Sequence, residues 1–153
     1  MYDLQDHGGL PHPVADARFY SGVPLRRLLA FVLDSIVIFI AGLIVALAFG
    51  LLTLGAGFAV FVPVMGVTGL AYRIGTLARW SATPGMWVTG IEFRRRDGHG
   101  FGLGEAVVHT VVYTVCMMTV ILQVVSVALM ALGPLGRGVP DLLLGSAAIN
   151  RPA

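Results

Sequence analysis

The sequence has little charge, a single cysteine and no lysine. Only 12% of its 153 residues are charged, whereas soluble domains typically carry about a quarter charged residues. A chain with so little polar surface cannot cover itself in water, and its 57% of hydrophobic residues lie in long blocks. These properties exclude an ordinary soluble domain and indicate one membrane-embedded domain.

Other absences exclude several kinds of site. Cys116 has no second thiol for a disulfide or a metal site, and its apolar surroundings predict a packing role. His7 and His12 lie five residues apart and lack the further donors that a metal site needs. The sequence contains no Gly-rich phosphate loop, H-E-x-x-H or G-x-S-x-G. We therefore expect no enzyme, no metal or other cofactor, and, at a net charge of +2, no nucleic-acid partner.

Residues 1–20 differ in composition from the rest of the chain. They contain proline, glycine, aspartate and histidine, and they lack the early apolar core of a signal peptide. We predict a disordered polar tail here and a transmembrane domain over residues 21–153.

Three apolar blocks come after this tail. Leu28–Gly50 and Phe58–Ala78 each approach the roughly 20 residues that a helix needs to cross a bilayer. Glu105–Leu132 is long for one span and too short for two, so it is either tilted or broken. The sequence therefore predicts an all-α membrane protein with about three transmembrane helices.

The polar segment between the second and third blocks has a different pattern. Its side chains alternate with a period near two from Met86 to Phe93, and the turn-forming pair Asp97-Gly98 lies after them. We predict a short hairpin at the membrane surface. Its three consecutive arginines would face water or anionic lipid headgroups: Arg94, Arg95 and Arg96.

Arginine placement predicts the topology. Arg26 and Arg27 precede the first block, further arginines lie between the second and third blocks, and the link between the first two has none. The positive-inside rule then places the N-terminus and the loop between the second and third blocks in the cytoplasm. Three complete spans would leave the C-terminal tail outside, whereas a broken or re-entrant third block would return it to the cytoplasmic side.

Three segments have a distinctive order and spacing. Arg27–Asp34 reads R-x-x-A-x-x-x-D, Thr83-Pro84-Gly85 opens the polar segment, and Pro140–Ala147 contains Asp141 and Gly145. Together they resemble the RDD family of small multi-pass membrane proteins, named for one arginine and two aspartates. The corresponding family elements are R-x-x-A-x-x-x-D, T-P-G-K and H-D-x-x-x-G-T.

The resemblance covers residues 21 to about 150 and implies a bacterial or archaeal inner-membrane protein. Met86, Pro140 and Ser146 depart from the family's Lys, His and Thr. A function that requires the lysine or the histidine is therefore in doubt. The resemblance supplies no activity beyond the transport that has been suggested for the family.

Charged residues within the apolar blocks are the main candidates for function. Asp34 lies roughly 10 Å along its helix from Arg27, where a carboxylate is costly unless it is paired or protonated. Arg73 lies roughly 9 Å from Arg79 on an antiparallel neighbour, at a matching depth. We predict an Asp34–Arg73 ion pair that either fixes helix register or takes part in transport.

Two residues at the start of the third block extend this cluster. Glu105 and His109 are one helical turn apart and could join Asp34 and Arg73. His109 is then either a proton relay or an interfacial histidine bonded to backbone. Asp141 could join only if the C-terminal tail returns to the cytoplasmic side.

Two functions remain open from the sequence. The first is a small ion or solute transporter, coupled to protons or cations, that acts as a homo-oligomer. The stripe Gly42, Ala46 and Gly50 would supply its contact face. The alternative is a non-catalytic scaffold or accessory subunit whose polar cluster is structural. The expected partners are membrane lipids and either further copies of the chain or another membrane protein.

Overall fold

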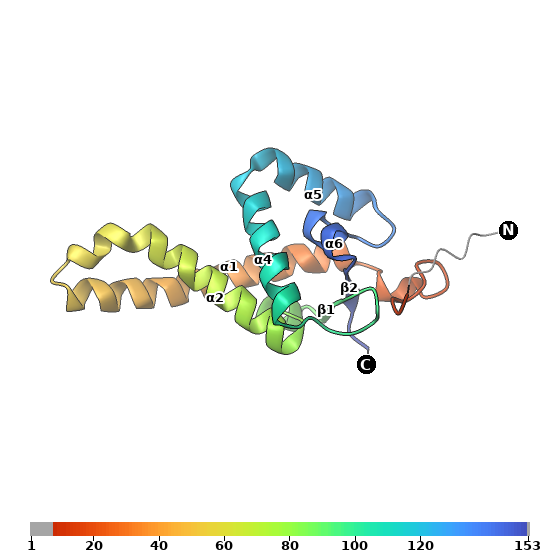
Figure 1. Ribbon diagram of the computed structural model, residues 1–153, viewed down its shortest axis with the longest axis horizontal. Helices are drawn as coiled ribbons and strands as arrows, with labels where there is room; N and C mark the ends of the chain where they lie inside the picture. Colours follow the sequence, from red (N-terminus) through yellow and green to blue (C-terminus); the bar gives the residue numbers. More distant parts are fainter. Residues whose placement is uncertain (1–7, 153) are drawn as a thin grey trace.

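The computed structural model describes residues 8–152 and is mostly helical (Figure 1). This confirms the all-α membrane class, with a little sheet. In chain order the elements are η1 (Ala17–Phe19), α1 (Val23–Leu52), η2 (Ala56–Val60), α2 (Phe61–Trp80), α3 (Pro84–Val88), β1 (Ile91–Arg94), α4 (Leu103–Met118), α5 (Val120–Leu132), α6 (Val139–Leu144) and β2 (Ala147–Asn150).

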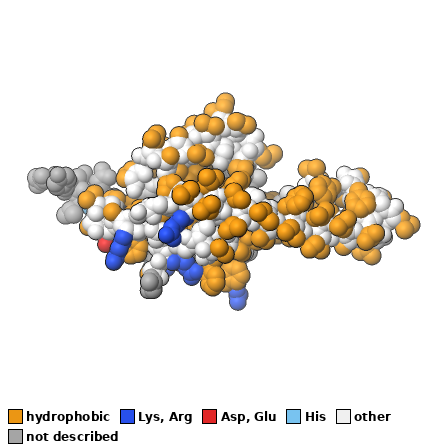
Figure 2. Space-filling view, turned by 180° about the vertical axis from the view of Figure 1, so that it is seen from behind, with side chains coloured by type: hydrophobic (Ala, Val, Ile, Leu, Met, Phe, Trp, Pro, Cys, Tyr) orange, Lys and Arg blue, Asp and Glu red, His pale blue; other side chains and the backbone are white. Residues whose placement is uncertain are grey.

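Helices α1 and α2 form a long antiparallel hairpin that projects from the rest of the molecule (Figure 1). Both are long and apolar enough to cross a membrane. Apolar side chains cover the projecting part, whereas arginines gather toward the opposite end (Figure 2). We call that end, which holds the sheet, the arginine end. Because so many large apolar side chains of α1 are exposed, this surface suits a lipid environment.

The small residues of α1 pack against α2 and η2 within the same chain. Gly42, Ala46 and Gly50 are all buried, and a Cβ on Gly42 or Gly50 would collide with Met65 or Phe58. Glycine therefore permits the close approach of the two helices. The sequence predicts this stripe as an oligomer contact face, but the intramolecular contact already occupies it.

The third apolar block is broken. Helices α4 and α5 meet at Thr119 with a bend of 116°. Strand β1 lies before this pair in the chain and strand β2 after it, and the two strands are hydrogen-bonded to each other. Both ends of the block therefore lie at the arginine end. The 16 residues of α4 span only about 24 Å, less than the roughly 30 Å of a bilayer core. The block is thus re-entrant, and it returns the C-terminal tail to the side of residues 80–104.

The predicted surface hairpin is wrong in its pairing. Residues at its start form α3, and β1 pairs antiparallel with β2, so that Ile91 lies opposite Asn150 and Arg94 opposite Ala147. The turn itself is present, because Gly98 has a φ of 81° and its N–H donates to the Arg95 carbonyl at 2.9 Å. The chain after the turn continues into α4, and so it forms no second strand.

The N-terminal segment differs from the predicted disordered tail where the structure describes it. Leu10 and Tyr20 are buried in a cluster with Leu135 and the β2 residues Ala147 and Ile149. The rest of the predicted tail, residues 1–7 with His7, lies outside the described residues. A second apolar cluster joins α1, α2 and β1 and supports the buried polar groups of the arginine end.

Candidate functional site

Asp141 lies at the centre of a buried ionic network at the arginine end. Its Oδ2 atom is 2.6 Å from Arg27 Nη1 and accepts the Gly138 N–H at 2.9 Å, while its Oδ1 atom is 3.1 Å from His109 Nε2. Arg27 also donates to the Gly136 carbonyl at 2.9 Å. Because these groups come from α1, α4 and α6, the network ties the start of α1 to the re-entrant block and the C-terminal segment.

The electrostatics of Asp141 keep it ionised. Burial raises the pKa of this carboxyl, but the charge of Arg27 and the hydrogen bond from His109 lower it more. The pKa of Asp141 is therefore held well below its usual range. At neutral pH the carboxylate and the Arg27 guanidinium form a charge-assisted hydrogen bond.

Asp34 is held by neutral donors. Its Oδ1 atom accepts the Tyr72 hydroxyl at 2.7 Å and the Gly85 N–H at 2.8 Å, and its Oδ2 atom accepts the Thr83 hydroxyl at 2.5 Å. Thr83 is also the N-cap of α3, where its oxygen accepts the Met86 N–H. The first carboxylate of the sequence motif thus docks the Thr83-Pro84-Gly85 segment onto α1.

The predicted Asp34–Arg73 ion pair is absent. The Arg73 guanidinium lies 3.8 Å from the ring centroid of Tyr113, and its buried Nε atom has no hydrogen-bond partner within residues 8–152. The sequence predicts that the two residues lie at similar depths, and in the structure both line one cavity. Depth along a helix does not fix direction around it, and the donors of α2 and α3 occupy the Asp34 carboxylate instead.

Glu105 does not join the cluster either. It accepts the Gly102 N–H at 2.9 Å in the first turn of α4 and pairs with Arg95 at 2.7 Å. His109, one turn later, is buried against Asp141. The Glu105 carboxylate therefore serves the helix start and the adjacent loop, where backbone donors and a neighbouring arginine are present.

The run of three arginines already has contacts within the protein. Arg94 pairs with Glu92 at 2.5 Å, and Arg95 pairs with both Asp97 and Glu105. The Arg96 carbonyl accepts the Gly9 N–H at 2.6 Å. Binding of lipid headgroups by these residues stays a prediction.

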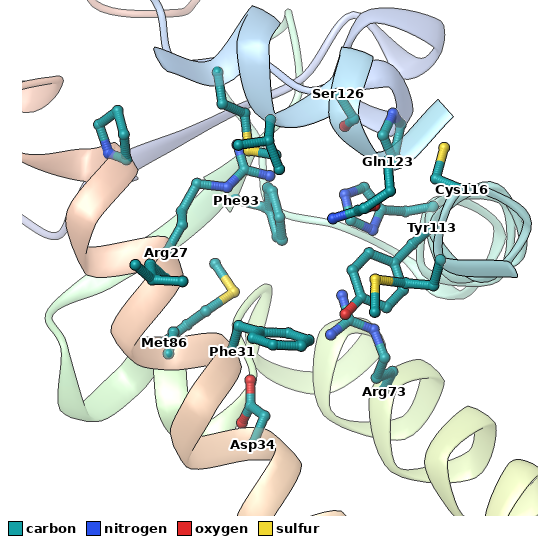
Figure 3. A pocket seen from close by; sticks show the side chains of 18 of the residues that line it. Arg27, Phe31, Asp34, Arg73, Met86, Phe93, Tyr113, Cys116, Gln123 and Ser126 are labelled. Atoms are coloured by element: carbon teal, nitrogen blue, oxygen red, sulfur yellow. The ribbon is translucent and has the colours of Figure 1, made fainter. Parts of the chain in front are cut away.

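A cavity of about 580 Å³ lies between α1, α2, α4 and α5. In Figure 3, Arg73 and Tyr113 lie beside each other on one wall, and Arg27 and Phe93 lie across the space from them. A second cavity of about 340 Å³ extends toward Ile38 and Met65. The two cavities share several lining residues: Asp34, Arg73, Tyr113, Phe31 and Met117.

Sequence reasoning misses several parts of this site. The role of Tyr72 is one, although a hydroxyl one residue from Arg73 within an apolar helix is a usable signal. The Ser126 hydroxyl oxygen accepts the Val139 N–H at 3.1 Å and so connects α5 to α6. No sequence pattern predicts this contact. Within residues 8–152 no group of three His, Cys, Asp or Glu side chains could hold a metal ion.

Comparison with known proteins agrees with this arrangement of motifs. The sequence model of the RDD family matches residues 22–145, which include Arg27, Asp34, the Thr83–Gly85 segment and Asp141. Searches of curated proteins and of solved structures find no match. The matched stretch covers more than half of the chain and contains both carboxylates with most of their partners. This membrane protein therefore belongs to the RDD family.

Proposed function

We propose that this RDD-family protein transports a small solute or ion across the inner membrane, coupled to protons or cations and without catalysing a chemical reaction. One observation carries the proposal: Asp34, Arg73 and Tyr113 line both of the cavities. Charged groups inside a membrane protein are costly, and they commonly mark the path of a substrate or an ion.

The separate contacts of Asp34 and Arg73 support a transport role. If Asp34 and Arg73 served only to fix helix register, the simplest arrangement would pair them with each other. Each instead lines the cavities separately, Asp34 with three neutral donors and Arg73 against an aromatic ring. In this proposal Asp34 is the titrating group that takes up and releases the coupling proton or cation. Arg73 and His109 modulate that titration.

The shape of the molecule supports a path that opens toward the arginine end. The cavities lie on that side of the hairpin, where Pro24 and Arg27 line the first of them. Beyond them α1 is closely packed against α2 through Gly42 and Met65, and against η2 through Gly50 and Phe58. In the proposed cycle, movement of the bent α4–α5 pair opens the path on alternating sides.

The proposed setting is the bacterial or archaeal inner membrane. The arginine end lies in the cytoplasm, and with it both the N-terminus and the C-terminal tail. Two spanning helices and one re-entrant block enclose little space, so we propose that several copies assemble among membrane lipids. Because α2 and η2 occupy the Gly42–Gly50 stripe, the contact between copies uses another face of the hairpin.

The test measures ion flux into proteoliposomes that contain the purified protein, under an imposed H⁺, Na⁺ or K⁺ gradient. We expect flux in the wild type and its loss in Asp34→Asn, which preserves the size of the side chain. The matched control is Asp97→Asn, because Asp97 is an exposed carboxylate remote from the cavities. Thermal unfolding shows whether each variant is folded. Absence of flux in the wild type under every gradient would overturn the proposal.

A scaffold or accessory subunit is the second candidate, and one feature favours it. Asp34 and Asp141 each tie together segments that are far apart in sequence, and each accepts several well-formed hydrogen bonds. That arrangement is also typical of a structural polar network. An inactive wild type whose Asp34→Asn variant loses only thermal stability would favour this function.

A further inference from the structure

We propose that the larger cavity binds an anionic amphiphile, a molecule with a carboxylate or phosphate head and an apolar chain. Its head would lie at Arg73 and its chain along the wall formed by α1 and α5. The inference deepens the proposed transport function by naming the class of solute, and it rests on that function only for the movement of the bound molecule across the membrane.

Arg73 has no direct ion-pair partner among residues 8–152. Of the two arginines that line the cavity, Arg27 is paired with Asp141 at 2.6 Å. Arg73 forms no ion pair and no side-chain hydrogen bond with any residue in the described range 8–152. A guanidinium presents five N–H donors in a planar fork that fits a carboxylate or a phosphate. Because an uncompensated charge in a membrane is costly, this cavity favours an anionic ligand.

The Asp34 carboxylate is held by other partners. Asp34 also lines the cavity, but Tyr72, Thr83 and Gly85 donate to its two oxygens. To reach Arg73 it would have to give up these bonds and release α3 from α1. The donors therefore hold the negative charge on the α1 wall and leave the Arg73 side of the cavity open.

Neutral donors line the same cavity as Arg73. Figure 3 shows Tyr113 of α4 beside the Arg73 guanidinium and Gln123 of α5 farther along the same cavity, beyond the Tyr113 ring. Among the described residues neither side chain has a hydrogen-bond partner in the protein. A phenol next to the guanidinium, and an amide in the same cavity, add donors that an anionic head can use.

The remaining wall is apolar and opens to the side of the molecule. Leu28 of α1 and Val127 of α5 both line the cavity, yet they are 57% and 50% exposed. Met130 and Phe31 continue the same wall. A small polar ion would leave this apolar wall unfilled, whereas an acyl chain that enters from the bilayer would cover it.

Binding can be measured with radiolabelled oleate and dioleoyl phosphatidic acid added to the purified protein in detergent. Oleyl alcohol and dioleoylglycerol are the uncharged counterparts, and acetate and inorganic phosphate are the heads without chains. We expect one or both anionic lipids to bind about tenfold more tightly than their neutral counterparts. The difference between oleate and phosphatidic acid identifies the preferred head.

Three variants test the assignment of the two ends. Arg73→Gln should lose about tenfold in affinity for the anionic lipid, whereas Arg79→Gln, an exposed arginine on the same helix, should lose nothing. Val127→Trp fills the space along the apolar wall and leaves Arg73 unchanged, so it should weaken lipid binding. This variant tests the proposal even if Arg73→Gln does not fold.

Four outcomes overturn the proposal. They are equal binding of neutral and anionic lipids, equal losses in the two arginine variants, unchanged binding in Val127→Trp, and tight binding of acetate or phosphate alone. Tight lipid binding in a protein that shows no flux would leave this inference standing and would count against transport.

Discussion

At the scale of single residues, the two motif carboxylates are stabilised in different ways. The negative charge of Asp141 is balanced by the positive charge of Arg27, and His109 is a further partner. Asp34 is compensated by neutral donors that belong to other segments. Loss of the Asp141 charge therefore leaves a cation without its partner, whereas loss of the Asp34 charge weakens hydrogen bonds.

Replacement of Asp141 by Asn should destabilise the protein strongly. The variant leaves Arg27, whose side chain is only 14% exposed, without a counterion. Breaking such a buried pair costs about 3 kcal/mol or more. Thermal unfolding in detergent measures the loss. Asp97→Asn, which removes an exposed carboxylate, should change the midpoint little. Similar losses in both variants would contradict the assigned role of Asp141.

The wild type and Asp141→Asn also yield a pH prediction. Folding lowers the pKa of Asp141, so the ionised carboxylate favours the folded state. Its stabilisation is complete above the pKa in the unfolded chain, about 3.9, and is lost as the pH falls toward the lower pKa of the folded protein. The gap in unfolding midpoint between wild type and Asp141→Asn should stay constant down to about pH 5 and shrink below about pH 4. A gap that closes near neutral pH would point to a different titrating group.

Gly85 should tolerate no side chain. A Cβ at this position would collide with the Ala30 carbonyl and lie 2.7 Å from Asp34 Oδ1. We expect Gly85→Ala to cost about 2 kcal/mol, because α3 must move away from α1 and Asp34 loses donors. Gly75→Ala is the control, since nothing lies within 4 Å of its Cβ and alanine favours helix. Equal effects on the unfolding midpoint would refute the close contact.

At the scale of elements, the sequence predicts what local patterns determine. Apolar length predicts α1 and α2, and the alternation from Met86 to Phe93 predicts a strand, of which the structure forms only β1 at Ile91–Arg94. The partner predicted for that strand is wrong, because alternation shows that a strand is half-buried but does not show which distant segment pairs with it. The site obeys the same rule: spacing places Asp34 and Arg73 at one depth, but long-range contacts choose their partners.

The pairing of β1 with β2 can be tested by a disulfide. Arg94 lies opposite Ala147, and antiparallel partners have Cα atoms about 4.5–5.5 Å apart, within the range of a disulfide. The double variant Arg94→Cys and Ala147→Cys should oxidise within one chain, as seen by a shift in non-reducing electrophoresis. Ala147→Cys combined with Leu54→Cys, beyond the opposite end of α1, should not. Failure of the first pair to cross-link would contradict the sheet register.

At the scale of the whole molecule, the sheet decides the topology. If α4 and α5 made one complete span, β2 would lie across the membrane from β1 and could not pair with it. The observed pairing therefore places residues 80–104 and the C-terminal tail on one side, with the link at Leu54 on the other. This explains how Arg27 and Asp141 meet, although 114 positions separate them in the chain.

Single cysteines can locate these segments in cells. In a Cys116→Ala background, cysteines replace Asp16, Asp97, Arg151 or Leu54 one at a time, and Leu54 is 98% exposed at the tip of the hairpin. A membrane-impermeant thiol reagent added outside should label only the Leu54→Cys protein, and the other three should react only after the membrane is opened. Labelling of Arg151→Cys from the outside, with Asp97→Cys protected, would show that the third block crosses the membrane. Labelling of Asp16→Cys and Asp97→Cys from outside, with Leu54→Cys protected, would instead invert the whole molecule and contradict the orientation that the arginines predict.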